Sequence, residues 1–66
     1  MEISEIEKQI IELTADEYTA KTISTKLNIS LKAVHNHKER LRKKTNTLNS
    51  VGLIIWAIKN NIIIIT

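Results

Sequence analysis

The chain has 66 residues, enough for one small domain near the lower size limit for folding around a single core. It has no cysteine, which excludes a disulfide framework and a cysteine zinc site, and one glycine with no proline favours short helices over hairpins. Lys59, Asn60 and Asn61 interrupt the apolar C-terminal run, so no stretch has the roughly 20 apolar residues that span a bilayer. We therefore expect a single all-α domain over residues 1–66, located in the cytoplasm and without membrane contact.

The formal net charge of +3 conceals a sharp division of charge along the chain. Residues 1–17 carry six acidic side chains and one lysine, whereas residues 21–44 carry eight basic side chains and a single acidic one, Glu39, for a net charge of +7. A concentrated basic segment is the electrostatic pattern of a surface that binds phosphates. The division therefore indicates a nucleic acid as the partner.

The first helix is predicted over residues about 4–15. Ser4 followed by Glu7 matches a capping box, in which the hydroxyl and the carboxylate each satisfy a free backbone amide. An apolar stripe follows at helical spacing, formed by Ile6, Ile10, Ile11 and Leu13.

Two further helices are predicted on either side of a tight turn. Thr19 is a plausible N-cap for a short helix over about 19–27, and Asn28 can adopt the left-handed conformation that ends it. Ser30 then caps a longer helix over about 30–45. This order of helix, tight turn and helix is typical of a helix-turn-helix.

A fourth helix is predicted over about 50–60, and its composition is too apolar for a helix with one face in water. We expect Leu48 to fold back onto the core before it, and Ile62 or Ile63 to close the core after it. Part of this helix should then meet another surface.

One pattern of positions runs through nearly the whole chain without a gap. It comprises Ile3, Ser4, Glu7, Ile10, Ile11, Leu13, Thr19, Lys21, Ile23, Leu27, Ile29, Ser30, Val34, His37, Leu41, Lys44, Ile54, Ala57, Ile62 and Ile63. The pattern resembles the LuxR/GerE-type DNA-binding domain, which is also found at the C-terminus of NarL-type response regulators. This resemblance implies an all-α, four-helix helix-turn-helix domain that binds double-stranded DNA as a bacterial transcriptional regulator, or as its C-terminal output domain.

Some positions depart from the pattern of that family. Glu17 stands where the family usually has a glycine, so the turn after the first helix is strained or built differently. Asn46 and Asn61 stand at other glycine positions, where asparagine tolerates the left-handed conformation. Ala33 replaces a usual threonine, which removes a hydroxyl that such domains can place near a phosphate.

The resemblance makes the helix over about 30–45 the recognition helix, whose N-terminal half enters the major groove. His35, Asn36 and Glu39 match the positions that reach base edges in this family, and helical spacing places them on the exposed face. Asn36 can pair with adenine, and Glu39 can accept a hydrogen bond from cytosine N4. The alternative for Glu39 is an ion pair with Lys43, four residues later.

Phosphate contacts require only reach and either positive charge or a hydrogen-bond donor. The candidates are Thr19, Lys21, Ser30, Lys32, Lys38 and Arg42. Lys43 and Lys44 have an alternative role as a solvated helix end that the helix dipole favours. His37 shares a face with Val34 and Leu41, which indicates a packed histidine, although its counterpart in the family lies near the DNA backbone.

Nothing in the sequence points to an enzyme. The string His35, Asn36, His37 suggests a nuclease motif only superficially, because residues two apart on a helix point about 200° from each other. The chain also lacks a Ser/His/Asp set, a glycine-rich phosphate loop and a carboxylate pair in a predicted cleft. We therefore expect no catalysis, no cofactor and no metal.

One helix-turn-helix contacts only half of a two-fold site, so a dimer is expected. The predicted dimer interface is Val51, Ile55, Trp56 and Ile58, and its small area implies weak association off DNA. The main alternative is a small protein-interaction module, an adaptor or anti-activator, that uses this helix to bind another regulator. RNA polymerase or another regulator is a further candidate partner. RNA binding is disfavoured because Tyr18 and Trp56 are the only aromatic side chains.

Overall fold

The computed structural model describes residues 3–64 of the chain. Within them it contains four helices and no strand: α1 (Glu5–Ala15), α2 (Ala20–Leu27), α3 (Leu31–Thr45) and α4 (Ser50–Lys59). The prediction of an all-α, four-helix fold is confirmed. Residues 1, 2, 65 and 66 of the predicted domain lie outside the described part, and so does Glu2 of the acidic segment.

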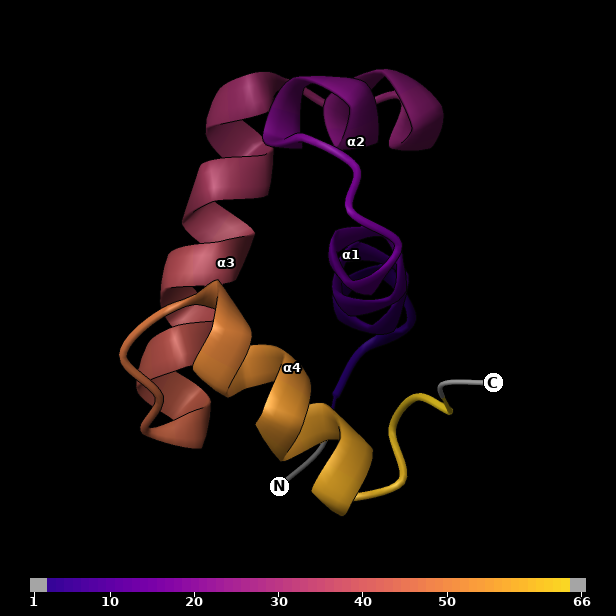
Figure 1. Ribbon diagram of the computed structural model, residues 1–66. Helices are drawn as coiled ribbons and strands as arrows, with labels where there is room; N and C mark the ends of the chain where they lie inside the picture. The colour runs from indigo at the N-terminus through magenta and orange to yellow at the C-terminus, as the bar shows by residue number, and fades with distance from the viewer. Residues whose placement is uncertain (1–2, 65–66) are drawn as a thin grey trace.

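The longest helix, α3, forms one side of the molecule, and α2 and α4 pack near its two ends (Figure 1). The first helix, α1, contacts all three of the others, whereas α2 and α4 do not contact each other. This arrangement leaves one long face of α3 uncovered by the other helices (Figure 1).

Every helix begins after a polar side chain that accepts a hydrogen bond from an amide in the first turn. These N-cap residues are Ser4, Thr19, Ser30 and Asn49. The predicted capping box is confirmed, because the Ser4 amide donates to Glu7 Oε1 at 2.9 Å and the Glu7 amide donates to Ser4 Oγ at 3.2 Å.

Every helix also ends in the same way, with a residue in the left-handed conformation. These residues are Glu17 (φ 69°), Asn28 (φ 55°), Asn46 (φ 57°) and Asn61 (φ 58°). In each case the amide of this residue and the next amide both donate to carbonyls of the preceding helix, as in a Schellman motif. Three of the four positions are asparagine, which tolerates this conformation, whereas Glu17 adopts it at a cost in free energy.

The core consists of two clusters of buried apolar side chains. One joins α1, α3, α4 and the C-terminal segment and contains Ile11, Leu41, Leu53, Ala57 and Ile63. The other joins α1, α2 and α3 and contains Ile10, Ile23 and Val34. Because adjacent residues on a helix point about 100° apart, Ile10 and Ile11 direct α1 into both clusters. The angle of the helix-turn-helix therefore rests on the second cluster, and the position of α4 rests on the first.

The segment between α3 and α4 differs from the prediction. Leu48 does not fold onto the core, because its side chain is 96% exposed. The turn at Asn46 instead directs Thr47 inward, where its hydroxyl lies 2.9 Å from the hydroxyl of the buried Thr45. Ile63 is buried and Ile62 packs beside it, so the prediction that this pair closes the core is confirmed.

Candidate nucleic-acid interface

The two helices of the predicted helix-turn-helix, α2 and α3, are held by backbone and apolar contacts. The Ile29 amide donates to the Ser24 carbonyl at 3.0 Å across the left-handed Asn28, which turns the chain between the helices. Ile23 of α2 and Val34 of α3 are both fully buried in the same cluster. These contacts fix the orientation of α2 relative to the start of α3.

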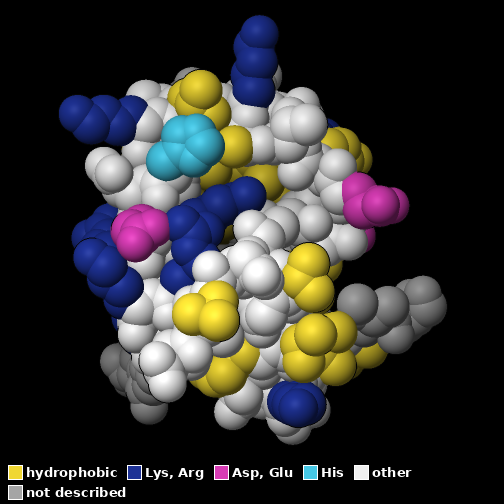
Figure 2. Space-filling view, turned by 60° about the vertical axis from the view of Figure 1, so that its left-hand side comes forward, with side chains coloured by type: hydrophobic (Ala, Val, Ile, Leu, Met, Phe, Trp, Pro, Cys, Tyr) yellow, Lys and Arg dark blue, Asp and Glu magenta, His cyan; other side chains and the backbone are white. Residues whose placement is uncertain are grey.

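The predicted base-contact residues, His35, Asn36 and Glu39, are all exposed on α3. Asn36 and Glu39, together with Arg40, line an open hollow of about 390 Å³. Figure 2 looks toward the side on which α3 lies, and it shows Lys and Arg side chains gathered there with a histidine and an acidic side chain among them. The structure thus places the predicted base-contact residues within a strongly basic surface.

The carboxylate of Glu39 forms an ion pair with Arg42. Arg42 Nη2 donates to Glu39 Oε2 at 2.6 Å, and the two side chains are 28% and 53% exposed, respectively. The predicted alternative, an ion pair between Glu39 and Lys43, is wrong. The Glu39 carboxylate pairs with Arg42, three residues later, and not with Lys43, four residues later. Arg42, a predicted phosphate contact, therefore already has an anionic partner.

The other predicted phosphate contacts differ in the exposure of their side chains and in the hydrogen bonds that these side chains already form. Lys21 and Lys32 are exposed, whereas Lys38 is half-buried, and burial together with the nearby charge of Arg42 lowers the pKa of its ammonium. The hydroxyl of Thr19 accepts from the Thr22 amide at 3.2 Å and donates to the Thr22 hydroxyl at 3.1 Å.

The hydroxyl of Ser30 is better placed to meet a phosphate than that of Thr19. It accepts from the Ala33 amide at 3.0 Å, and its hydrogen has no acceptor within residues 3–64. Ser30 can therefore cap α3 and donate to a phosphate at the same time.

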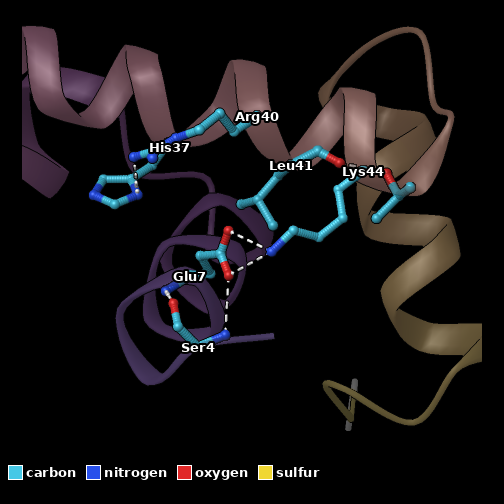
Figure 3. Close-up of polar contacts among 7 residues, drawn as sticks. Ser4, Glu7, His37, Arg40, Leu41 and Lys44 are labelled. Carbon is cyan, nitrogen blue, oxygen red and sulfur yellow. Dashed lines mark hydrogen bonds and ion pairs between the residues drawn. The ribbon is translucent and has the colours of Figure 1, made fainter. Parts of the chain in front are cut away.

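Lys44 is not the solvated helix end that the sequence suggested. Its ammonium donates to Glu7 Oε1 at 3.1 Å and to Glu7 Oε2 at 3.2 Å, which joins α3 to α1 (Figure 3). Glu7 as a residue is only 7% exposed. Burial opposes ionisation of its carboxylate, but hydrogen bonds from Ser4 and Lys44 outweigh this effect and lower the pKa of Glu7. This pair has a structural role beside the basic surface.

Arg40 is a basic residue for which the sequence pattern indicated no specific contact. Its Nη2 lies 3.4 Å from Nδ1 of the half-buried His37, and both side chains lie on the side of α3 that faces the start of α1 (Figure 3). Arg40 also lines the hollow beside Asn36 and Glu39. The spacing of three between residues 37 and 40 was the only sequence signal for this contact.

A row of apolar side chains lies exposed on α4. Val51 is 69% exposed, Ile55 is 48% exposed and Ile58 is 39% exposed. Trp56, the fourth residue of the predicted dimer interface, packs against the core instead, whereas Leu48 precedes the row at a spacing of three. Although α4 is strongly apolar, none of the helices in residues 3–64 is long and apolar enough to cross a membrane.

Known proteins similar to this chain are regulators. A family model described as bacterial regulatory proteins of the luxR family matches residues 1–57, and this is not a class of enzymes. Over 57 residues the chain is 42% identical to a protein of Pyropia yezoensis named probable transcriptional regulator ycf29. Proteins of the same name in Porphyra purpurea and Cyanophora paradoxa are 40% and 35% identical. These matches cover 86% of this chain but only 26%, 27% and 27% of the relatives, so the chain spans about a quarter of their length. No solved structure matches the chain significantly.

Proposed function

Because the chain belongs to the luxR family of bacterial regulatory proteins, we propose that it binds double-stranded DNA selectively and regulates transcription. The observation that carries this proposal is the exposed, basic face of α3 at the helix-turn-helix. In this binding mode α3 enters the major groove and α2 lies across the DNA backbone. The relatives are named as probable transcriptional regulators, which supports the same role, and we propose that the chain acts in the cytoplasm.

Base recognition is assigned to the exposed residues on the groove-facing side of α3. The amide of Asn36 can both donate and accept, which suits the N6 and N7 atoms of adenine. Glu39 keeps one carboxylate oxygen available for a base donor, and His35 can contact guanine or a phosphate. The shared hollow of Asn36 and Glu39 supports this assignment.

Phosphate contacts are assigned to groups that flank these residues. The exposed ammonium groups of Lys21 and Lys32 and the hydroxyl of Ser30 are the strongest candidates. Thr19 and Arg42 already have intramolecular partners and Lys38 is partly buried, so these three are weaker candidates. Such contacts set the position of the protein on the duplex without selecting a sequence.

The apolar row on α4 supports weak homodimerisation. A two-fold dimer would place two copies of α3 about one DNA turn apart, so that each reads one half-site. Val51, Ile55 and Ile58 form the centre of this surface, and Trp56 supports it from the core side.

The same row favours one second candidate function. An adaptor or anti-activator would use the exposed side chains from Leu48 to Ile58 to bind another regulator or RNA polymerase. Such a module would need no contact between α3 and DNA. The two functions therefore differ in which helix changes its environment when DNA is added.

The proposed function can be tested by the salt dependence of binding. Duplexes selected from a random pool should bind the chain with an affinity that falls steeply between about 50 and 200 mM salt. Lys32→Ala should weaken binding to all duplexes and reduce the slope of log affinity against log salt by about 0.9. Lys8→Ala is the matched control, because Lys8 is exposed on α1 outside the basic segment. An affinity that does not respond to salt or to Lys32→Ala would contradict the proposal.

A further inference from the structure

Glu39 lies where an isolated carboxylate would be unfavourable. It is the single acidic residue among eight basic ones in residues 21–44, and it is exposed on the face of α3 that is proposed to enter the groove. The phosphates of DNA repel a carboxylate there, so a reading role requires a cation to offset the charge.

Arg42 supplies that cation and donates to only one of the two carboxylate oxygens of Glu39. Its Nη2 donates to Glu39 Oε2 at 2.6 Å, whereas Oε1 accepts no hydrogen bond within residues 3–64. The Arg42 side chain is the more buried partner, at 28% exposed against 53% for Glu39. The Glu39 carboxylate is thus held at one oxygen, and its other oxygen has no hydrogen-bond partner within residues 3–64.

Two open hollows border the pair. Glu39 shares one hollow with Asn36 and Arg40, toward the N-terminal half of α3. It shares another with Arg42, Lys43 and the turn before α4. Glu39 therefore lies between Asn36, a proposed base-contact residue, and the Arg42 guanidinium with which it pairs.

We propose that Arg42 is a positioning residue for base recognition, because it holds the Glu39 carboxylate with Oε1 free to accept a hydrogen bond from a cytosine amino group. This inference rests on the proposed function and assigns Arg42 a role beyond a phosphate contact. Cytosine fits better than adenine, because adenine places the N7 acceptor beside its amino donor and that acceptor would repel a carboxylate.

The test is a base-preference profile of four variants on the duplex that the wild-type chain selects. Arg42→Gln removes the charge, Glu39→Gln removes the anion, and the double variant removes both. Lys43→Gln is the matched control, because Lys43 is exposed and is also within helical reach of Glu39 but does not pair with it. Far-UV circular dichroism establishes that each variant keeps its helices.

The proposal predicts that Arg42→Gln and Glu39→Gln lose preference for cytosine at the same single position, each by at least about fivefold. Glu39→Gln should shift that preference toward adenine, with which glutamine pairs. The double variant should lose no more preference than either single variant. Lys43→Gln should weaken binding to all duplexes alike and keep the cytosine preference.

Two results would overturn the proposal. Arg42→Gln could weaken binding to all duplexes equally while the preference for cytosine remains, which would make Arg42 a phosphate contact only. Glu39→Gln could leave every base preference unchanged, which would make the pair a surface ion pair. A wild-type chain that binds no duplex at all would overturn the proposed function, and this outcome is recognised before any variant is made.

Discussion

Lys44 Nζ lies 3.1 Å and 3.2 Å from the two carboxylate oxygens of Glu7, and this contact joins the last turn of α3 to the first turn of α1. The same carboxylate accepts from the Ser4 amide and so also caps α1. One buried group thereby fixes the start of one helix and the end of the recognition helix. The contact orients α3 without occupying its exposed face.

Removal of Lys44 should destabilise the fold. In Lys44→Met the carboxylate of Glu7 stays buried but loses its ammonium partner, which should cost about 1 to 3 kcal/mol of unfolding free energy. Lys43→Met changes the neighbouring exposed lysine and should cost less than about 0.5 kcal/mol. Urea unfolding at neutral pH measures both, and equal costs for the two variants would contradict a structural role for the pair.

The same pair should make stability depend on pH in the acidic range. The folded protein lowers the pKa of Glu7, so the unfolded chain takes up the proton at a higher pH than the folded one does. The stabilisation is therefore complete above the ordinary carboxyl pKa and is lost as the pH falls through the lowered value. The difference in unfolding free energy between wild type and Glu7→Gln should shrink over this range. Parallel stability curves for the two proteins would contradict the assignment.

Glu17 is a site at which the stability of the chain can be raised. It adopts φ 69° in the Schellman motif after α1, whereas the other three such positions are asparagine. Glu17→Gly should stabilise the fold by about 0.5 to 1 kcal/mol, because glycine has no Cβ to strain in this conformation. Asn46→Gly is the control and should raise the unfolding free energy by less, since asparagine already tolerates the left-handed conformation. Thermal unfolding would contradict this account if Glu17→Gly melted at a lower temperature than wild type.

Local features of this fold could be predicted from the sequence. Capping depends on residues within one turn of each other, so Ser4, Thr19 and Ser30 could be placed as N-caps before the structure was known. The left-handed residues Asn28 and Asn46 follow from the same short-range chemistry. The all-α fold then follows because the apolar positions between these caps repeat at helical spacing.

Contacts that depend on the path of the chain could not be predicted. Lys44 and Glu7 are 37 residues apart, and only the packing of α1 against α3 brings them together. The exposure of Leu48 follows from the turn at Asn46, which directs Thr47 inward. Arg42 and Lys43 are both within helical reach of Glu39. Which of the two forms the ion pair with Glu39 therefore depends on side-chain conformation.

The apolar row on α4 should control self-association. Ile55→Asp places a charge at the centre of the row, so it should abolish weak dimers and lower affinity for a two-fold DNA site by at least about tenfold, with little change for a single half-site. Gln9→Asp adds the same charge to the exposed surface of α1, away from the row, and should have neither effect. Sedimentation measures association, and the dimer proposal is contradicted if wild type and Ile55→Asp behave identically.

The proposed function requires that the chain binds duplex DNA through α2 and α3. The most direct measurement is amide chemical-shift mapping of the isotope-labelled chain during titration with its selected duplex. If α2 and α3 bind the duplex, the largest chemical-shift changes should occur between Thr19 and Lys44, including Asn36, and they should diminish as salt is raised. Unchanged amides in α2 and α3 on addition of duplex, with changes in α4 alone when another regulator is added, would contradict it and favour an adaptor.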